Sequence, residues 1–248
     1  MVKVSVLLKT ADGAIPTTVF HSDNLDDSSQ RQGIILYMDA FGPRPALDEI
    51  ADRLANEGYS VLVPDLFYRF GNYGPLDPKM AFSTPTGKDK IMSMIHETTH
   101  KMIARDTDAF LDFFSETGFT GSIGALGYCM GGGYAISAAA AHPERIVAVA
   151  IFHGEGLASD EPDSPHLRAG SIKARLYIGC AGVDPNFSPE QSARLAQELR
   201  QAGVDHIIEN YIEMKHGWAV PDHLAFDLEG AERHWRRLLM FFGDTMWR

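Results

Sequence analysis

A cysteine flanked by two glycines is the residue of this chain best suited to nucleophilic chemistry. Cys129 lies in the segment Gly127, Tyr128, Cys129, Met130, Gly131, between an apolar run and a stretch rich in small residues. This G-x-C-x-G pattern is typical of a strained strand–turn–helix, where any side chain at the glycine positions would strike a neighbouring element. The helix N-terminus favours a thiolate and a developing oxyanion. We therefore expect Cys129 to be a nucleophile and the Met130 amide to be one oxyanion-hole donor.

Short apolar strands and amphipathic helices must position this cysteine. Two alternating segments, 2–9 and 14–21, flank Asp12 and Gly13 and predict an antiparallel hairpin. Buried strands are expected in six apolar runs, at 33–38, 59–64, 122–126, 145–152, 175–180 and 206–212. Helices with one apolar face alternate with these runs, which predicts a mostly parallel sheet covered on both faces. Residues 1–248 are expected to form a single α/β domain, with irregular segments at 68–90 and 154–172.

Two further polar residues occur where predicted strands end. Asp184 follows the run 175–180 and His216 follows the run 206–212. Both residues are therefore expected on loops at the carboxyl edge of the sheet. In α/β-hydrolases the chain order is nucleophile, acid, histidine, which Cys129, Asp184 and His216 reproduce. His216 would take the thiol proton and later activate water, while Asp184 would fix the histidine tautomer.

Other side chains near these positions are candidates for the substrate pocket. His153 ends the run 145–152 at the same edge of the sheet, and Tyr128 and Trp218 adjoin the proposed nucleophile and base. Solvent exposure is expected for the remaining histidines of predicted helices, strand ends and caps, namely His142, His206, His223 and His234. Cys180 lacks the glycine pattern and is expected to be a core residue.

The motifs taken together resemble those of the dienelactone hydrolase family, the cysteine branch of the α/β-hydrolases. The likeness covers nearly the whole chain and is carried by GYCMGGG at 127–133, GVDP at 182–185, KHGW at 215–218 and YMDAFG at 37–42. It implies a single-domain α/β-hydrolase fold and hydrolysis of a small ester or lactone. It also implies a Cys–His–Asp triad, a thioester acyl-enzyme, and no cofactor or metal.

The resemblance also assigns roles to the loop after the run 33–38. It places the second oxyanion-hole amide on Ala40, and it makes Asp39 a modulator of the thiol, at a position where the family usually has glutamate. Enzymes that act on dienelactone carry an arginine four residues after the catalytic histidine, where this chain has Val220. The sequence therefore leaves the substrate open between dienelactone and a neutral ester or lactone.

A second motif supports a different chemistry. Residues 96–100 read H-E-x-x-H, which on a helix would place His96 and His100 on one face as zinc ligands, with Glu97 as general base. The nearest candidate for a third ligand is Glu116. A zinc hydrolase is therefore one alternative, and a non-catalytic binding protein of the same fold is another.

Charge and hydropathy limit the partners to be expected. The chain has 33 acidic and 22 basic residues, a formal net charge of -11 at pH 7, which repels nucleic acids and anionic membranes. It has no apolar run of the roughly 18 residues that a membrane span needs, and its first residues lack a signal-peptide pattern. We expect a cytoplasmic monomer or small homo-oligomer that acts on a small-molecule ester or lactone, without nucleic acid or membrane partners.

Overall fold

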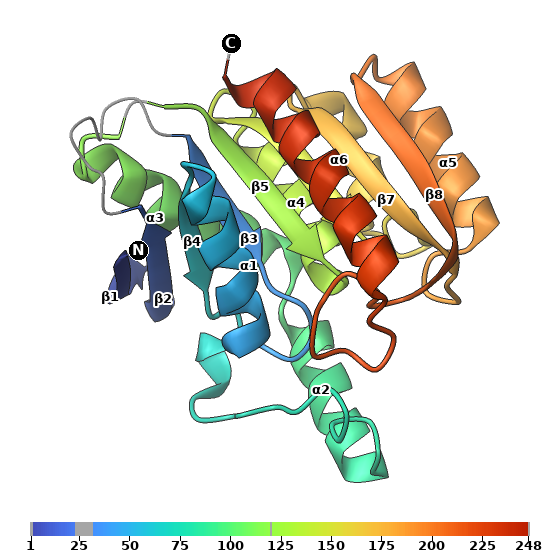
Figure 1. Cartoon of the computed structure of the whole chain (residues 1–248), viewed down its shortest axis with the longest axis horizontal. Helices are drawn as coiled ribbons and strands as arrows, with labels where there is room; N and C mark the ends of the chain where they lie inside the picture. The colour runs from blue at the N-terminus through green and yellow to red at the C-terminus, as the bar shows by residue number, and fades with distance from the viewer. Residues whose placement is uncertain (1, 23–31, 120, 248) are drawn as a thin grey trace.

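An eight-stranded sheet organises the molecule (Figure 1). The computed structural model describes residues 2–22, 32–119 and 121–247. The sheet order is β1-β2-β4-β3-β5-β6-β7-β8. In chain order the strands are β1 (Val2–Thr10), β2 (Gly13–His21), β3 (Gly33–Tyr37), β4 (Ser60–Pro64), β5 (Ile123–Tyr128), β6 (Ile146–Phe152), β7 (Arg175–Val183) and β8 (His206–Lys215).

The sheet is parallel except at its N-terminal edge. β1 and β2 form an antiparallel hairpin that closes at the pair Thr10 and Gly13, and β2 also runs antiparallel to β4. The other neighbouring strands are parallel, so their carboxyl ends share one edge. This arrangement is the α/β-hydrolase fold predicted from the sequence, with its N-terminal hairpin.

Helices cover both faces of the sheet (Figure 1). α1 and α6 pack on one face, and α3, α4 and α5 lie on the other. The helices are α1 (Pro45–Asn56), α2 (Pro85–Glu97), α3 (His100–Glu116), α4 (Met130–Ala141), α5 (Pro189–Gln201) and α6 (Leu228–Met246), with 3-10 turns η2 (Tyr68–Phe70) and η3 (Pro165–Ser171). α2 projects beyond the carboxyl edge, so this helix can border a site there.

Local signals explain where these helices begin. The Ser188 side chain accepts a hydrogen bond from the Gln191 amide and so caps α5, and Asp227 caps α6 in the same way through Gly230. α2 begins inside the segment expected to be irregular because Thr84 caps it and a proline occupies its first turn. The capping pattern of α2 was therefore present in the sequence, although its weak apolar periodicity concealed it.

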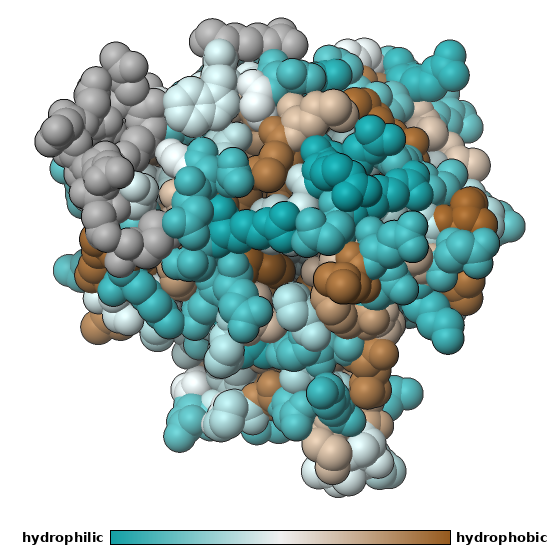
Figure 2. Space-filling model, viewed as in Figure 1, coloured by the Kyte–Doolittle hydropathy of each residue, from teal (hydrophilic) through white to brown (hydrophobic). Residues whose placement is uncertain are grey.

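The surface is mostly hydrophilic, and its apolar residues form scattered groups in the view of Figure 2. No helix among the described residues combines the length and apolar character that crossing a bilayer requires.

A buried polar pair joins the sheet to its last helix. The Tyr128 hydroxyl of β5 and Nε2 of His234 in α6 lie 2.9 Å apart, and both side chains are fully buried. Nδ1 of His234 lies 3.2 Å from the Ala231 carbonyl, so the neutral ring donates there and accepts from the tyrosine. The expectation that His234 is exposed was wrong, because it lies on the inner face of α6.

This pair predicts a specific loss of stability in acid. Burial lowers the pKa of His234 to about 3, whereas in an unfolded chain it would be about 6.5. As pH falls below about 6.5 the unfolded state binds a proton that the folded state does not, so folding is weakened. His234→Gln should reduce the difference in unfolding free energy between pH 7.5 and pH 5 by about 2 kcal/mol. Urea unfolding at both pH values measures it.

The matched control is His96→Gln, which changes an exposed histidine on α2. It should leave the difference between the two pH values as it is in the unmodified protein. An equal effect of both substitutions would contradict the role of His234.

Candidate active site

The sharpest turn of the backbone carries the cysteine. Cys129 lies between β5 and α4 and has a φ of 54°, in the left-handed region that residues with a side chain rarely adopt. A Cβ on Gly127 would lie 2.2 Å from the Gly131 carbonyl oxygen, and a Cβ on Gly131 would lie 2.2 Å from that of Tyr37. Both positions therefore need glycine, as the sequence pattern predicted, and the turn holds the thiol at the carboxyl edge of the sheet.

The histidine and the acid approach the thiol from the last two strands. Asp184 follows β7 and His216 follows β8, and Nδ1 of His216 lies 2.7 Å from Oδ2 of Asp184. The Asp184 side chain is 1% exposed. Nε2 of His216 is buried and has no hydrogen-bond partner within the described part of the chain. This arrangement fixes the ring and leaves Nε2 free to accept a proton.

Two backbone amides face the sulfur. Those of Met130 and Ala40 both hydrogen-bond to Cys129, one from the first residue of α4 and the other from the loop after β3. These are the two residues predicted for the oxyanion hole. Amides that stabilise negative charge on sulfur are well placed for the oxygen of a tetrahedral intermediate beside it.

The carboxylate that contacts the thiol is Glu155, which the sequence analysis missed. It lies on the loop after β6, and its Oε2 accepts a hydrogen bond from Cys129 Sγ at 3.6 Å. Asp39 was expected in this role, but both of its carboxylate oxygens accept hydrogen bonds from Arg44, at 2.6 and 2.9 Å. The strand-end rule that identified Asp184 and His216 would also have found Glu155, three residues beyond β6.

Burial is the largest influence on the pKa values of Cys129 and Glu155. It raises the pKa of the Cys129 thiol well above its ordinary value, and the nearby carboxylates Glu155 and Asp39 raise it further, while the two amides oppose them. Burial also raises the pKa of Glu155, against the opposing effects of His216 and the thiol. These pKa shifts favour the neutral thiol, and in the structure the thiol donates to Glu155.

Arg44 joins the two loops that flank the site. Besides Asp39, its guanidinium binds Asp222, with Nε 2.7 Å from Oδ2 and Nη2 2.8 Å from Oδ1. The Arg44 side chain is only 7% exposed. Asp39 precedes the Ala40 amide, and Asp222 lies six residues after His216, so one buried cation connects the oxyanion loop to the histidine loop.

A cavity of about 420 Å³ opens above the sulfur. Its wall is mainly apolar and includes Phe41, Phe82, Met92 and Ile95, together with Cys129, Glu155, Asn186, His216 and His223. His223 was expected to be exposed, but it forms part of this wall. No lysine or arginine is among the described lining residues.

The three residues predicted for the pocket lie beneath the site instead of in the cavity wall. Tyr128 is held in the core by His234, and Trp218 is fully buried against Tyr211. The His153 ring is buried and packs against the His216 ring, with 5.0 Å between their centroids. Tyr128 contacts His234 of α6, and Trp218 packs on Phe152 and Tyr211, so these side chains belong to the core.

Val220 is also fully buried, in the turn that follows His216. It supplies no charge to the cavity.

The H-E-x-x-H motif does not form a zinc site. α2 ends at Glu97 and α3 begins at His100, so the two histidines do not share a helix face. Nδ1 of His100 lies 3.0 Å from the Ser137 hydroxyl. Glu116 is at the far end of α3, about 24 Å along the helix from His100. The break at Thr98 and Thr99, where Thr99 caps α3, therefore overturns the zinc interpretation.

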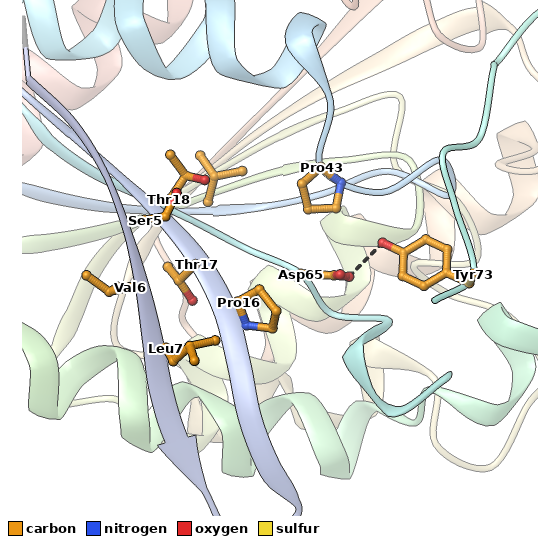
Figure 3. A pocket seen from close by; sticks show the side chains of 10 residues that line it. Ser5, Val6, Leu7, Pro16, Thr17, Thr18, Pro43, Asp65 and Tyr73 are labelled. Atoms are coloured by element: carbon orange, nitrogen blue, oxygen red, sulfur yellow. Dashed lines mark hydrogen bonds between the residues drawn. The ribbon is translucent and has the colours of Figure 1, made fainter. Parts of the chain in front are cut away.

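Another cavity lies between the N-terminal hairpin and the loops after β3 and β4 (Figure 3). It measures about 280 Å³ and is bordered by Pro16, Pro43, Asp65 and Tyr73 among others. The Tyr73 hydroxyl donates to the Asp65 carboxylate at 2.7 Å. None of the residues that line it is a nucleophile paired with a histidine.

Comparison with known proteins identifies the family of this chain. The sequence model of the dienelactone hydrolase family matches residues 17–246. The chain belongs to the dienelactone hydrolase family. A carboxymethylenebutenolidase of Rhodococcus opacus is 25% identical over 244 residues, which cover 96% of this chain and 90% of that protein. Family membership makes this chain a hydrolase related to the dienelactone hydrolases.

Solved structures share the fold. One from Klebsiella pneumoniae, classed as a dienelactone hydrolase, has a TM-score of 0.84 at 21% identity and covers 98% of both chains. A dienelactone hydrolase-like promiscuous phosphotriesterase from metagenomic libraries has a TM-score of 0.74 at 21% identity, covering 99% of this chain and 100% of the other. At these identities the likeness establishes the fold alone.

The Arg44 connection predicts a large effect on stability. Arg44→Met would leave the Asp39 carboxylate buried without its cation and should lower the unfolding free energy by about 3–5 kcal/mol. The control is Lys173→Met, which removes an exposed ion pair with Glu144 and should cost less than about 1 kcal/mol. Urea unfolding of both variants measures the difference. Equal losses would mean that the buried pairs contribute no more than the surface pair.

Proposed function

We propose that this protein hydrolyses small esters or lactones through a thioester formed on Cys129. The observation that carries the proposal is the meeting of three groups at one point. The thiol of Cys129, a carboxylate oxygen of Glu155 and a ring nitrogen of His216 lie within 4.8 Å of one another, beside two amides that face the sulfur. This set contains a nucleophile, a base and an oxyanion hole, which are the groups that acyl transfer requires.

Acylation begins with loss of the thiol proton. In the resting pair the thiol donates to Glu155, and a substrate that enters the cavity would displace this contact and bring the sulfur toward its carbonyl. His216 Nε2 takes the proton, and Asp184 stabilises the resulting imidazolium. The sulfur bonds to the carbonyl carbon while the Met130 and Ala40 amides bind the oxyanion. The carbon–oxygen bond of the ester then breaks, and His216 returns the proton to the departing alkoxide.

Deacylation uses the same groups with water as the nucleophile. Nε2 of His216 removes a proton from water, which attacks the thioester carbon. The tetrahedral intermediate collapses, the carbon–sulfur bond breaks, and the sulfur recovers a proton from His216. The acid product leaves. With a lactone the alcohol remains covalently attached to the acyl group throughout, so deacylation releases a single hydroxy acid.

The cavity favours acyl groups without negative charge. Apolar side chains form most of its wall, Val220 supplies no cation, and Glu155 lies beside the sulfur. A carboxylate on the substrate would meet this carboxylate with no described lysine or arginine in the wall to balance it. We therefore infer a preference for neutral esters and lactones.

The thiol mechanism predicts complete dependence on one cysteine. Cys129→Ala should lower kcat for p-nitrophenyl acetate by at least about a thousandfold, because the nucleophile is lost. Cys180→Ala is the control and should retain activity, since Cys180 is buried in β7 and does not line the cavity above the sulfur. In the unmodified protein, acid quenching during turnover should trap one acetyl group, detected by intact-protein mass spectrometry.

Two results would exclude this function. Retained hydrolysis by Cys129→Ala would exclude the thiol mechanism. If the intact protein neither hydrolyses nor is acylated by a panel of esters and lactones, it would instead be a binding protein of this fold.

A further inference from the structure

Three metal-binding side chains meet at the candidate nucleophile. Donor atoms of Cys129, Glu155 and His216 lie within 4.8 Å of one another, and within the described ranges no other group of histidine, cysteine and acidic side chains is this compact. Sγ and Oε2 are already 3.6 Å apart, close to the spacing of two ligands on one tetrahedral ion. Small side-chain rotations could therefore bring all three donors onto one ion.

The mixture of donors selects the metal. Sulfur, imidazole nitrogen and one carboxylate oxygen suit zinc, whereas calcium and magnesium prefer sites made of oxygen. Three protein ligands with a fourth open position describe an accessible zinc site. Here that position would face the cavity of about 420 Å³ above the sulfur.

His216 is already held as zinc-binding histidines are held. Its Nδ1 contacts Asp184 at 2.7 Å, which directs Nε2 toward the thiol, and Nε2 has no partner of its own within the described residues. A carboxylate behind the ring fixes its tautomer and makes the other nitrogen a better ligand. Asp184 would therefore support a metal as well as it supports catalysis.

Charge also favours a divalent cation. A thiolate and the Glu155 carboxylate together carry two negative charges in a largely buried site, and one zinc ion would neutralise both. The cavity wall has no described lysine or arginine that would repel the ion. The chain as a whole carries a formal charge of -11, which attracts cations.

We propose that Cys129, Glu155 and His216 reversibly bind one zinc ion, which inhibits the hydrolase. Binding forms zinc bonds to Sγ, to Nε2 and to a Glu155 oxygen, and the thiol proton passes to solvent. The bound ion occupies both the nucleophile and the base, so acyl transfer stops until zinc leaves. The inhibition rests on the proposed function, whereas the binding site does not.

The binding itself is tested without substrate. Zinc titrated into the chelator-treated full chain should bind with a stoichiometry of one by calorimetry, and cobalt should give the sulfur-to-metal charge-transfer absorption of a thiolate complex. Cys129→Ser should abolish that absorption. Glu155→Gln, which keeps the size of the side chain, should weaken zinc binding by at least about tenfold because it replaces a ligand.

The matched control is Glu161→Gln, which changes an acidic residue of the adjoining cavity that lies outside the three-residue group. It should bind zinc as the unmodified protein does. Circular dichroism establishes whether each variant is folded. If Glu155→Gln does not fold, His216→Asn provides a second variant that lacks a ligand. Absence of saturable binding, or equal affinity in Glu155→Gln and the unmodified protein, would overturn the site.

Inhibition is measured separately by adding zinc during hydrolysis of p-nitrophenyl acetate. Activity should fall as the site fills and return with a chelator. If the protein binds zinc but has no hydrolase activity, the metal site would be supported and the proposed function would be contradicted. Hydrolysis unaffected by zinc at concentrations that fill the site would overturn the inhibition.

Discussion

The backbone conformation of Cys129 is the constraint on which the site depends. A positive φ at this residue turns the chain from β5 into α4 within one position and brings the start of the helix against β3. Gly131 packs so closely on the Tyr37 carbonyl that a side chain at this position would clash with it. Because β3 is held there, the loop that follows it can direct the Ala40 amide at the sulfur. The strained turn thus places both the nucleophile and its hydrogen-bond donors.

The site must also accommodate several acidic groups in little space. Asp39 and Glu155 act on the thiol and Asp184 lies behind His216, and each carboxylate is satisfied by a different partner. Arg44 binds the first, the thiol donates to the second, and His216 contacts the third. Arg44 neutralises the Asp39 carboxylate and does not line the cavity. The thiol of Cys129, the carboxylate of Glu155 and the imidazole of His216 therefore lie together at the cavity. That combination can serve acyl transfer, and it is also a set of zinc ligands.

Sequence patterns identified the parts of the fold that depend on local structure. Alternation predicted the hairpin of β1 and β2, apolar runs predicted the parallel strands, and the glycine spacing predicted the turn at Cys129. The order of Cys129, Asp184 and His216 predicted which loops would approach one another. Strand ends in a parallel sheet share one edge, so these predictions needed no knowledge of side-chain packing.

Long-range contacts were not accessible in the same way. The sequence alone determined the fold class, the strained turn and the edge of the sheet where chemistry would occur, because periodicity and glycine spacing reflect local backbone geometry. The tertiary structure decided that Glu155 contacts the thiol, that Arg44 holds Asp39, and that Tyr128 and Trp218 lie below the cavity. It also separated His96 from His100 by a break between two helices. These outcomes depend on how loops pack against distant elements, and a loop side chain carries no periodic signal of its direction.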